Sequence, residues 1–208
     1  MFVVIIVGWQ SPLLAIQLLW INLITDSIPA IALGMSPGDA EVMQEKPRKP
    51  DEDFFAHHAG IRTIILGTVV GLVSAYMFWY GHDVRGYSPF DANVPDDVLT
   101  YARTMTFITM ILAEMFFALS IQSETHSIFS GYSWRNRLLI VSVFGAVAIQ
   151  MALVFIPALS NIFHLTALDF YDWDMILFAS SIPLVLNEVR KYIASRRLIG
   201  EKKNLSLS

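Results

Sequence analysis

The chain has 208 residues, of which 55% are hydrophobic and 15% are charged, and its formal net charge is −4. Its mean hydropathy of +0.54 lies outside the usual balance of a soluble domain of this size, so a membrane protein is the default interpretation. Because the sequence contains no cysteine, disulfides and thiolate metal sites are excluded for this stretch.

Residues 1–8, MFVVIIVG, are too short to cross a bilayer and lack the basic start and the cleavage site of a signal peptide. They resemble half a helix, which the polar turn WQSP at 9–12 joins to the next apolar run as a tight hairpin. We therefore expect the chain to begin partway through a span. An ordinary short membrane-dipping N-terminus is the alternative.

The remaining apolar residues fall into runs long enough to cross a hydrocarbon core of about 30 Å. We predict an all-α membrane protein, a helical bundle of about five full transmembrane helices plus the partial N-terminal helix. The predicted spans are 15–34, 61–80, about 102–121, 138–156 and a weaker one at 173–192. The last contains Pro183 and a short apolar core, so we expect a snorkelling Arg190 or Lys191 to help it reach the interface.

The placement of lysine and arginine predicts the orientation of these spans. All but two of the 14 basic residues lie in segments 35–62 and 122–137 or in the tail from residue 190, and the exceptions are Arg85 and Arg103. We predict that the basic side and the C-terminus are cytoplasmic, and that residues 35–60 form a cytoplasmic loop. Near the inner end of the last span, Lys191 can reach Glu188 at i+3.

Two acidic residues, Asp26 and Glu114, lie deep within predicted spans. An ionised carboxylate at the centre of a spanning helix costs about 2.5 to 3.5 kcal/mol on insertion scales. Leucine would serve better for packing alone. An intramembrane acid is therefore a candidate functional site that faces a cavity, an ion or a proton path.

Asn22, Thr25 and Asp26 stand at i, i+3 and i+4, so they share one helix face. Pro29 has no N–H to donate to the carbonyl of Thr25, which frees a further oxygen. Hard cations such as Ca2+ prefer ligand sets made only of oxygens, and broken helices at membrane depth commonly supply them. Together with Glu114 on another helix, these residues predict a cation site.

Each of these polar residues has a structural alternative. Asn22 could hydrogen-bond across a helix interface, and Thr25 could bond back to the carbonyl of Ile21. Glu114 could be protonated and hydrogen-bonded inside the bundle. The functional interpretation depends on the combination, because amide, hydroxyl and carboxylate stand within five residues and a second acid lies elsewhere.

Residues 17–48, QLLWINLITDSIPAIALGMSPGDAEVMQEKPR, resemble the sixth transmembrane helix and following cytoplasmic loop of calcium-transporting P-type ATPases, the sarcoplasmic-reticulum-pump-like branch. Residues 114–127, EMFFALSIQSETHS, resemble that family's eighth helix and exit loop. The resemblance implies that residues 1–208 form the C-terminal transmembrane domain of such a pump. It places the family's metal ligands on Asn22, Thr25, Asp26 and Glu114. One departure is Ser27, where the eukaryotic calcium pumps carry glycine.

We find neither the Asp-Lys-Thr-Gly phosphorylation motif nor the Thr-Gly-Glu-Ser dephosphorylation motif, and no nucleotide-binding domain. The resemblance therefore implies that this chain alone does not hydrolyse ATP. It implies Ca2+ as the transported ion, with Mn2+ or another cation as the alternative. ATP and Mg2+ would act only through the missing domains.

The implied partners are the lipid bilayer and the remaining N-terminal helices and cytoplasmic domains of the pump, with no nucleic acid. We expect an integral, multi-pass protein of a prokaryotic plasma membrane. Two other functions stay open at this point. One is a self-contained cation-coupled secondary transporter or channel-like protein, and the other is a non-catalytic remnant that binds a partner subunit.

Overall fold

The computed structural model describes residues 4, 6–25, 27–35, 59–91, 93–121, 127–128 and 136–205, with the backbone alone at 24, 25, 59, 62 and 194–205. Within these ranges the regular structure is helical, and there are no strands. The predicted all-α class is confirmed.

The first described residues form a helical turn that ends at a glycine. Val4 and Ile6 are helical, and Gly8 has a φ of +87°, a conformation that favours glycine. The N–H of Trp9 donates to the carbonyl of Val4 at 3.1 Å, which is the bond expected where a left-handed residue ends a helix. The partial N-terminal helix predicted from residues 1–8 agrees with this turn.

Four described segments are long and apolar enough to cross a membrane. The first, Ala15–Gly34, has three parts, and the others are single helices. In chain order the elements are α2 (Ala15–Trp20), the π-helix η1 (Ile21–Thr25), α3 (Ser27–Gly34), α4 (Ala59–Asp83), α5 (Asp96–Ser120) and α6 (Arg137–Phe155). A short helix, α7 (Pro157–Ile162), follows α6. The four segments match the first four predicted spans.

The fifth predicted span lies inside α8 (Phe170–Leu205), a helix of 36 residues. Pro183 lies within α8 without ending it. Of the two residues expected to reach the interface, Arg190 or Lys191, the side chain of Lys191 is only 3% exposed. Its ammonium group donates within the bundle, to the carbonyl of Ser120 at the end of α5 and to the carboxylate of Glu188 on α8.

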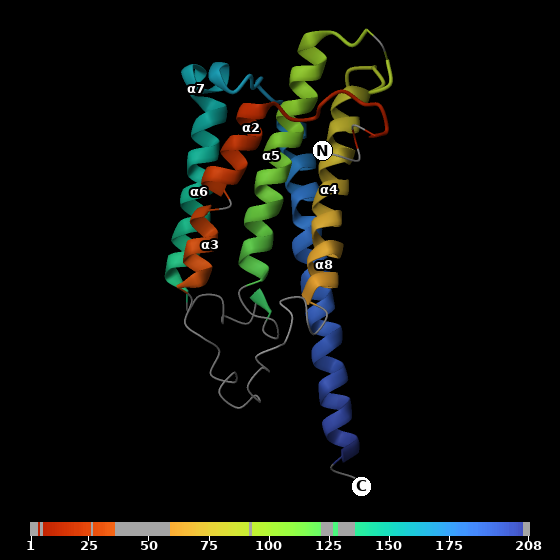
Figure 1. Cartoon of the computed structure of the whole chain (residues 1–208), viewed down its shortest axis with the longest axis vertical. Helices are drawn as coiled ribbons and strands as arrows, with labels where there is room; N and C mark the ends of the chain where they lie inside the picture. The colour runs from red at the N-terminus through yellow and green to blue at the C-terminus, as the bar shows by residue number, and fades with distance from the viewer. Residues whose placement is uncertain are drawn as a thin grey trace.

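Helix α5 forms the centre of the bundle. It contacts α4, α8, α6, α3 and η1, and Figure 1 shows it between α4 and α8 on one side and α3 and α6 on the other. It is the most buried of the four candidate spans. Fully buried side chains such as Met105, Ile108 and Ile111 form much of the core. Any residue on α5 is therefore positioned by several neighbouring helices.

Small residues let α4 and α5 approach closely. A Cβ added to Gly81 would lie 2.7 Å from the Cα of Ala102, so only glycine fits there. Ser74 lies seven residues before Gly81 on α4, and Thr109 lies seven residues after Ala102 on α5. Seven residues are about two helical turns, and the two helices are antiparallel, so both residues face the same interface. Both hydroxyl oxygens are buried, and neither has a hydrogen-bond partner within the described ranges.

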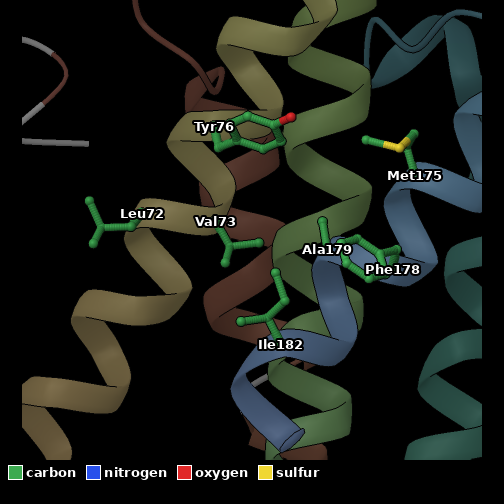
Figure 2. Close-up of a pocket in the computed structure, with 7 residues that line it drawn as sticks. All are labelled: Leu72, Val73, Tyr76, Met175, Phe178, Ala179 and Ile182. Atoms are coloured by element: carbon green, nitrogen blue, oxygen red, sulfur yellow. The ribbon is translucent and has the colours of Figure 1, made fainter. Parts of the chain in front are cut away.

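An apolar groove of about 300 Å³ lies between α4 and α8. Figure 2 shows the residues that line it, which are Leu72, Val73 and Tyr76 from α4 and Met175, Phe178, Ala179 and Ile182 from α8. The two helices therefore do not pack closely along this stretch. Each of the two helices also contacts α5.

Polar contacts join segments at the end of the bundle where α5 begins. The hydroxyl of Tyr101 donates to Asp172 at 2.5 Å, and the guanidinium of Arg85 lies 4.2 Å from the centre of the Tyr101 ring. Arg103 donates to the carbonyl of Ser11 at 2.9 Å. The fully buried Gln17 donates to the carbonyl of Phe163 at 3.0 Å. Gln17 thus connects α2 to the chain after α7.

Candidate cation site

The middle of the first span is a π-helical turn. Its residues, Ile21–Thr25, lie between α2 and α3. A π-helix closes each turn through i→i+5 hydrogen bonds and is wider than an α-helix, and such turns occur frequently at functional sites. Pro29 follows in the first turn of α3, where a missing N–H is tolerated. The helix is therefore irregular just before Pro29, as the sequence predicts.

Two predicted ligands belong to this turn. Asn22 is its second residue and has an exposed side chain, and Thr25 is its last residue, described by its backbone alone. The carbonyl of Asn22 accepts a hydrogen bond from the hydroxyl of Ser27 at 3.3 Å. Asp26 lies outside the described residues, so its placement stays a prediction.

The fourth predicted ligand, Glu114, is a partly buried residue of α5. Its neighbours in sequence, Ala113 and Met115, are buried in the core. Because α5 contacts both η1 and α3, the helix that carries Glu114 packs against the segment that carries Asn22 and Thr25. The structure thus brings together the two segments from which the predicted ligands come.

The chemistry available at this place comes from oxygen atoms. Among the residues that the structure describes, no three histidine or acidic side chains form a metal-binding group. The predicted set instead combines an amide, a hydroxyl and backbone carbonyls with the carboxylates of Asp26 and Glu114. Such mixed oxygen sets suit hard cations. The composition of the set remains a prediction because one of its two acids is not described.

A second polar group lies at the C-terminal end of α5, and we call it the α5–α8 polar cluster. Its members are Ser120, Ser127, Asn187, Glu188 and Lys191. The predicted contact between Lys191 and Glu188 is confirmed, with 2.8 Å between nitrogen and oxygen. The same Glu188 oxygen accepts from the hydroxyl of Ser120 at 2.9 Å.

The other half of the Glu188 carboxylate binds the chain that follows α5. It accepts from the hydroxyl of Ser127 at 2.6 Å and from the N–H of Ile128 at 3.2 Å. Lys191 also donates to the carbonyl of Ser120 at 2.5 Å. The sequence indicates only the local pair, because Ser120 and Ser127 lie 68 and 61 residues from Glu188. No local spacing indicates contacts of that range.

Comparison with known proteins assigns the chain to a family. Residues 10–193 match the family model described as cation transporting ATPase, C-terminus. The chain is 37% identical over 196 residues to calcium-transporting ATPase 1 of Bacillus cereus, an alignment that covers 92% of the chain and 22% of that relative. It is 30% identical over 234 residues to the calcium-transporting ATPase of Plasmodium falciparum, covering 97% of the chain and 19% of the relative.

A third relative comes from a fungus. The endoplasmic reticulum calcium ATPase srcA of Aspergillus fumigatus is 28% identical over 229 residues, covering 98% of the chain and 24% of that protein. The chain therefore spans less than a quarter of the length of each relative. The family model, in contrast, matches most of it. The chain belongs to the family of cation-transporting ATPase C-terminal regions.

Proposed function

We propose that this chain is the membrane part of an ATP-driven Ca2+ pump and supplies Asn22, Thr25, Asp26 and Glu114 as ligands of the transported ion. The observation that carries the proposal is the π-helical turn in the middle of a bilayer-length span, packed against α5. Irregular helices at membrane depth are tolerated where they are buried in protein or line a cavity. A cation site explains why this turn carries polar residues.

The ligand set has the charge and chemistry that Ca2+ requires. Ca2+ takes about six to eight oxygen ligands from carboxylates, amides, carbonyls and water. Asp26 and Glu114 would offset the two positive charges of the ion, while Asn22 and Thr25 would replace part of its hydration shell. The same two carboxylates would bind protons when the ion has left. Other segments of the pump and water would complete the coordination.

The set is drawn from two helical segments, which suggests how affinity changes during transport. Three of the residues belong to the first span, and Glu114 belongs to α5. A small shift of one segment against the other would separate the ligands and lower the affinity for the ion. Phosphorylation in domains outside this chain would cause that shift, and the loop at 35–60 would help to transmit it. ATP and Mg2+ would bind only in those domains.

The names of the relatives support calcium as the transported ion, since all three are calcium-transporting or calcium ATPases. The four apolar helices support a multi-pass protein in a lipid bilayer. We place its basic side and its C-terminus in the cytoplasm, because of the distribution of lysine and arginine. The site residues and the orientation are both open to direct tests.

A chimeric pump tests the ligand set. This chain would replace the matching C-terminal region of the Bacillus cereus relative, and phosphorylation by ATP would be measured against Ca2+ concentration. We expect Asp26→Asn to abolish Ca2+-dependent phosphorylation and Glu114→Gln to weaken or abolish it. Asp174→Asn, at an exposed position of α8, is the matched control and should leave it unchanged.

Normal phosphorylation of Asp26→Asn at micromolar Ca2+ would refute the ligand role. The amount of each variant in the membrane and its melting temperature in detergent show whether it has folded. A separate measurement addresses the alternative function. Ca2+ flux into liposomes that contain only this chain would favour a self-contained transporter over the pump.

A further inference from the structure

The α5–α8 polar cluster holds a buried cation against the end of a helix. The last carbonyls of an α-helix have no intrahelical donor and need another partner. Ser120 ends α5, and its carbonyl accepts from the ammonium group of Lys191, a residue of another helix. A cation at this end of α5 also interacts favourably with the helix dipole. Lys191 thus caps α5 from outside.

Glu188 extends this contact to a third segment. Its carboxylate joins Lys191 and Ser120 to the chain around Ser127 and Ile128. Asn187 adds a bond from its amide to the hydroxyl of Ser120 at 2.8 Å. The end of α5 is therefore held by polar contacts from three residues of α8, Asn187, Glu188 and Lys191. Such an arrangement restricts both sliding and rotation of α5.

Stability alone is a weak reason for this arrangement. Lys191 is 3% exposed, and desolvating a charge is costly even when it is paired. Apolar residues of similar volume are often as stabilising as a buried ion pair or more so, whereas breaking the pair is destabilising. A buried pair can instead select one geometry among several. A role in positioning a predicted ligand is a stronger reason, because Glu114 lies on the same helix as Ser120.

Glu114 precedes Ser120 by six residues on the same helix. With a rise of about 1.5 Å per residue, the two lie about 9 Å apart along the axis. The intervening residues are all helical, so the position of Ser120 determines how Glu114 is rotated and how deep it lies. A contact that holds Ser120 therefore also holds Glu114.

The helices that carry the predicted ligands are tied to different neighbours. The first span is bound to α6, through Trp20 donating to Gln150 at 3.2 Å and Asn136 donating to the carbonyl of Ala32 at 3.1 Å. Helix α5 is bound to α8, through the polar cluster and through Ser180, which donates to the carbonyl of Thr109 at 3.2 Å. One further bond, from Arg103 of α5 to the carbonyl of Ser11, joins α5 to the chain that leads into the first span.

We propose that Glu188 and Lys191 are positioning residues of the cation site, which hold α5 so that Glu114 keeps a defined place opposite the π-helical turn. This inference rests on the proposed function. Neither Glu188 nor Lys191 touches the ion.

The same chimeric pump tests the inference, through the Ca2+ concentration that gives half-maximal phosphorylation. Lys191→Met removes the ammonium group but keeps the length of the side chain. We expect it to raise the half-maximal Ca2+ concentration about tenfold while the maximal phosphoenzyme level changes far less. Lys191→Arg retains the charge and should restore most of the affinity. The milder Glu188→Asp should shift the affinity in the same direction by a smaller factor.

Asp174→Asn is the matched control, because it removes a charge from an exposed position of the same helix, outside the cluster. We expect no change in half-maximal Ca2+ for this variant. A purely structural role of the cluster would lower the amount of protein and its melting temperature without changing half-maximal Ca2+ in the folded fraction. That result with Lys191→Met would overturn the inference.

Two outcomes separate this inference from the proposed function. If Asp26→Asn and Glu114→Gln leave the Ca2+ dependence unchanged, the proposed ligands are wrong and the positioning role falls with them. If they abolish it while folded Lys191→Met binds Ca2+ normally, only the positioning role is wrong. Where Lys191→Met does not fold, Glu188→Asp decides, and an unchanged half-maximal Ca2+ in that variant contradicts the inference.

Discussion

The hydroxyl of Ser27 donates a hydrogen bond to the carbonyl of Asn22, 3.3 Å away and five residues earlier in the chain. The bond spans the end of the π-helical turn, so it links the irregular part of the first span to the start of α3. Ser27 was identified from sequence only as a departure from the glycine of related pumps. Its hydroxyl stabilises the conformation of the turn that carries two predicted ligands.

We expect Ser27→Ala to lower the free energy of unfolding by about 0.5 kcal/mol, the low end for a hydrogen bond because this one is exposed. Ser27→Gly should lower the free energy of unfolding by about 0.5 to 1 kcal/mol more than Ser27→Ala, since glycine adds backbone freedom to the unfolded chain. Denaturation of the purified protein in detergent measures both. A glycine variant more stable than the alanine variant would contradict this explanation.

The close contact between Gly81 and Ala102 gives a second prediction. A methyl group at position 81 would lie 2.7 Å from the Cα and 2.9 Å from the Cβ of Ala102, and neither atom can rotate away. Gly81→Ala should therefore force α4 and α5 apart and lower the melting temperature, with a cost of about 1 to 3 kcal/mol. Thermal unfolding of the Gly81→Ala variant in detergent measures the change in melting temperature.

Gly71 provides the control for this substitution. It also lies in α4, but an added Cβ would meet no atom within 4 Å. Gly71→Ala should be neutral or stabilising by up to about 1 kcal/mol, because alanine is the better helix former. Equal effects of the two substitutions would show that helix propensity, rather than helix packing, determines the result at position 81.

The contact between Tyr101 and Asp172 gives a third prediction. Both residues are buried, and the other carboxylate oxygen of Asp172 accepts from the N–H of Asp169 at 2.7 Å. Tyr101→Phe keeps the ring beneath Arg85 but removes one donor from the carboxylate. We expect a loss of about 1.5 to 3 kcal/mol, as for hydrogen bonds to charged groups.

Denaturant unfolding would measure the loss of stability in Tyr101→Phe, and Tyr76→Phe is the control variant. Tyr76 is 48% exposed on α4, so loss of its hydroxyl should change the stability by less than about 0.5 kcal/mol. If Tyr101→Phe is equally harmless, the hydrogen bond to Asp172 contributes little to the fold.

The sequence predicted the spans well because each is a continuous apolar run. The ends of the helices were harder to predict, because helices continue past the apolar segment. Helix α5 begins at Asp96, several residues before the predicted span, since acidic residues suit the first turn of a helix even outside an apolar run. Helix α8 extends to Leu205 because charged residues do not end a helix.

The candidate site was predictable where it depended on local spacing. Asn22 and Thr25 share a turn because they are three residues apart, and Pro29 indicated that the helix would be disturbed. The π-helical register itself and the bond from Ser27 depend on how the turn packs against α5. The roles of Ser120 and Ser127 depend on contacts with α8, which no pattern along the chain predicts.

A buried hydroxyl without a partner gives the last prediction. The Thr109 hydroxyl has no acceptor or donor within the described ranges, whereas that of Thr106, on the same helix, donates to the carbonyl of Ala102 at 2.8 Å. An unsatisfied buried polar group costs about 1 to 3 kcal/mol, so Thr109→Val should raise the free energy of unfolding by an amount in that range. Thr106→Val removes a satisfied hydroxyl and should be neutral or mildly destabilising. The free energies of unfolding of both variants in detergent test this prediction, and a destabilised Thr109→Val would contradict the view that the hydroxyl is unsatisfied.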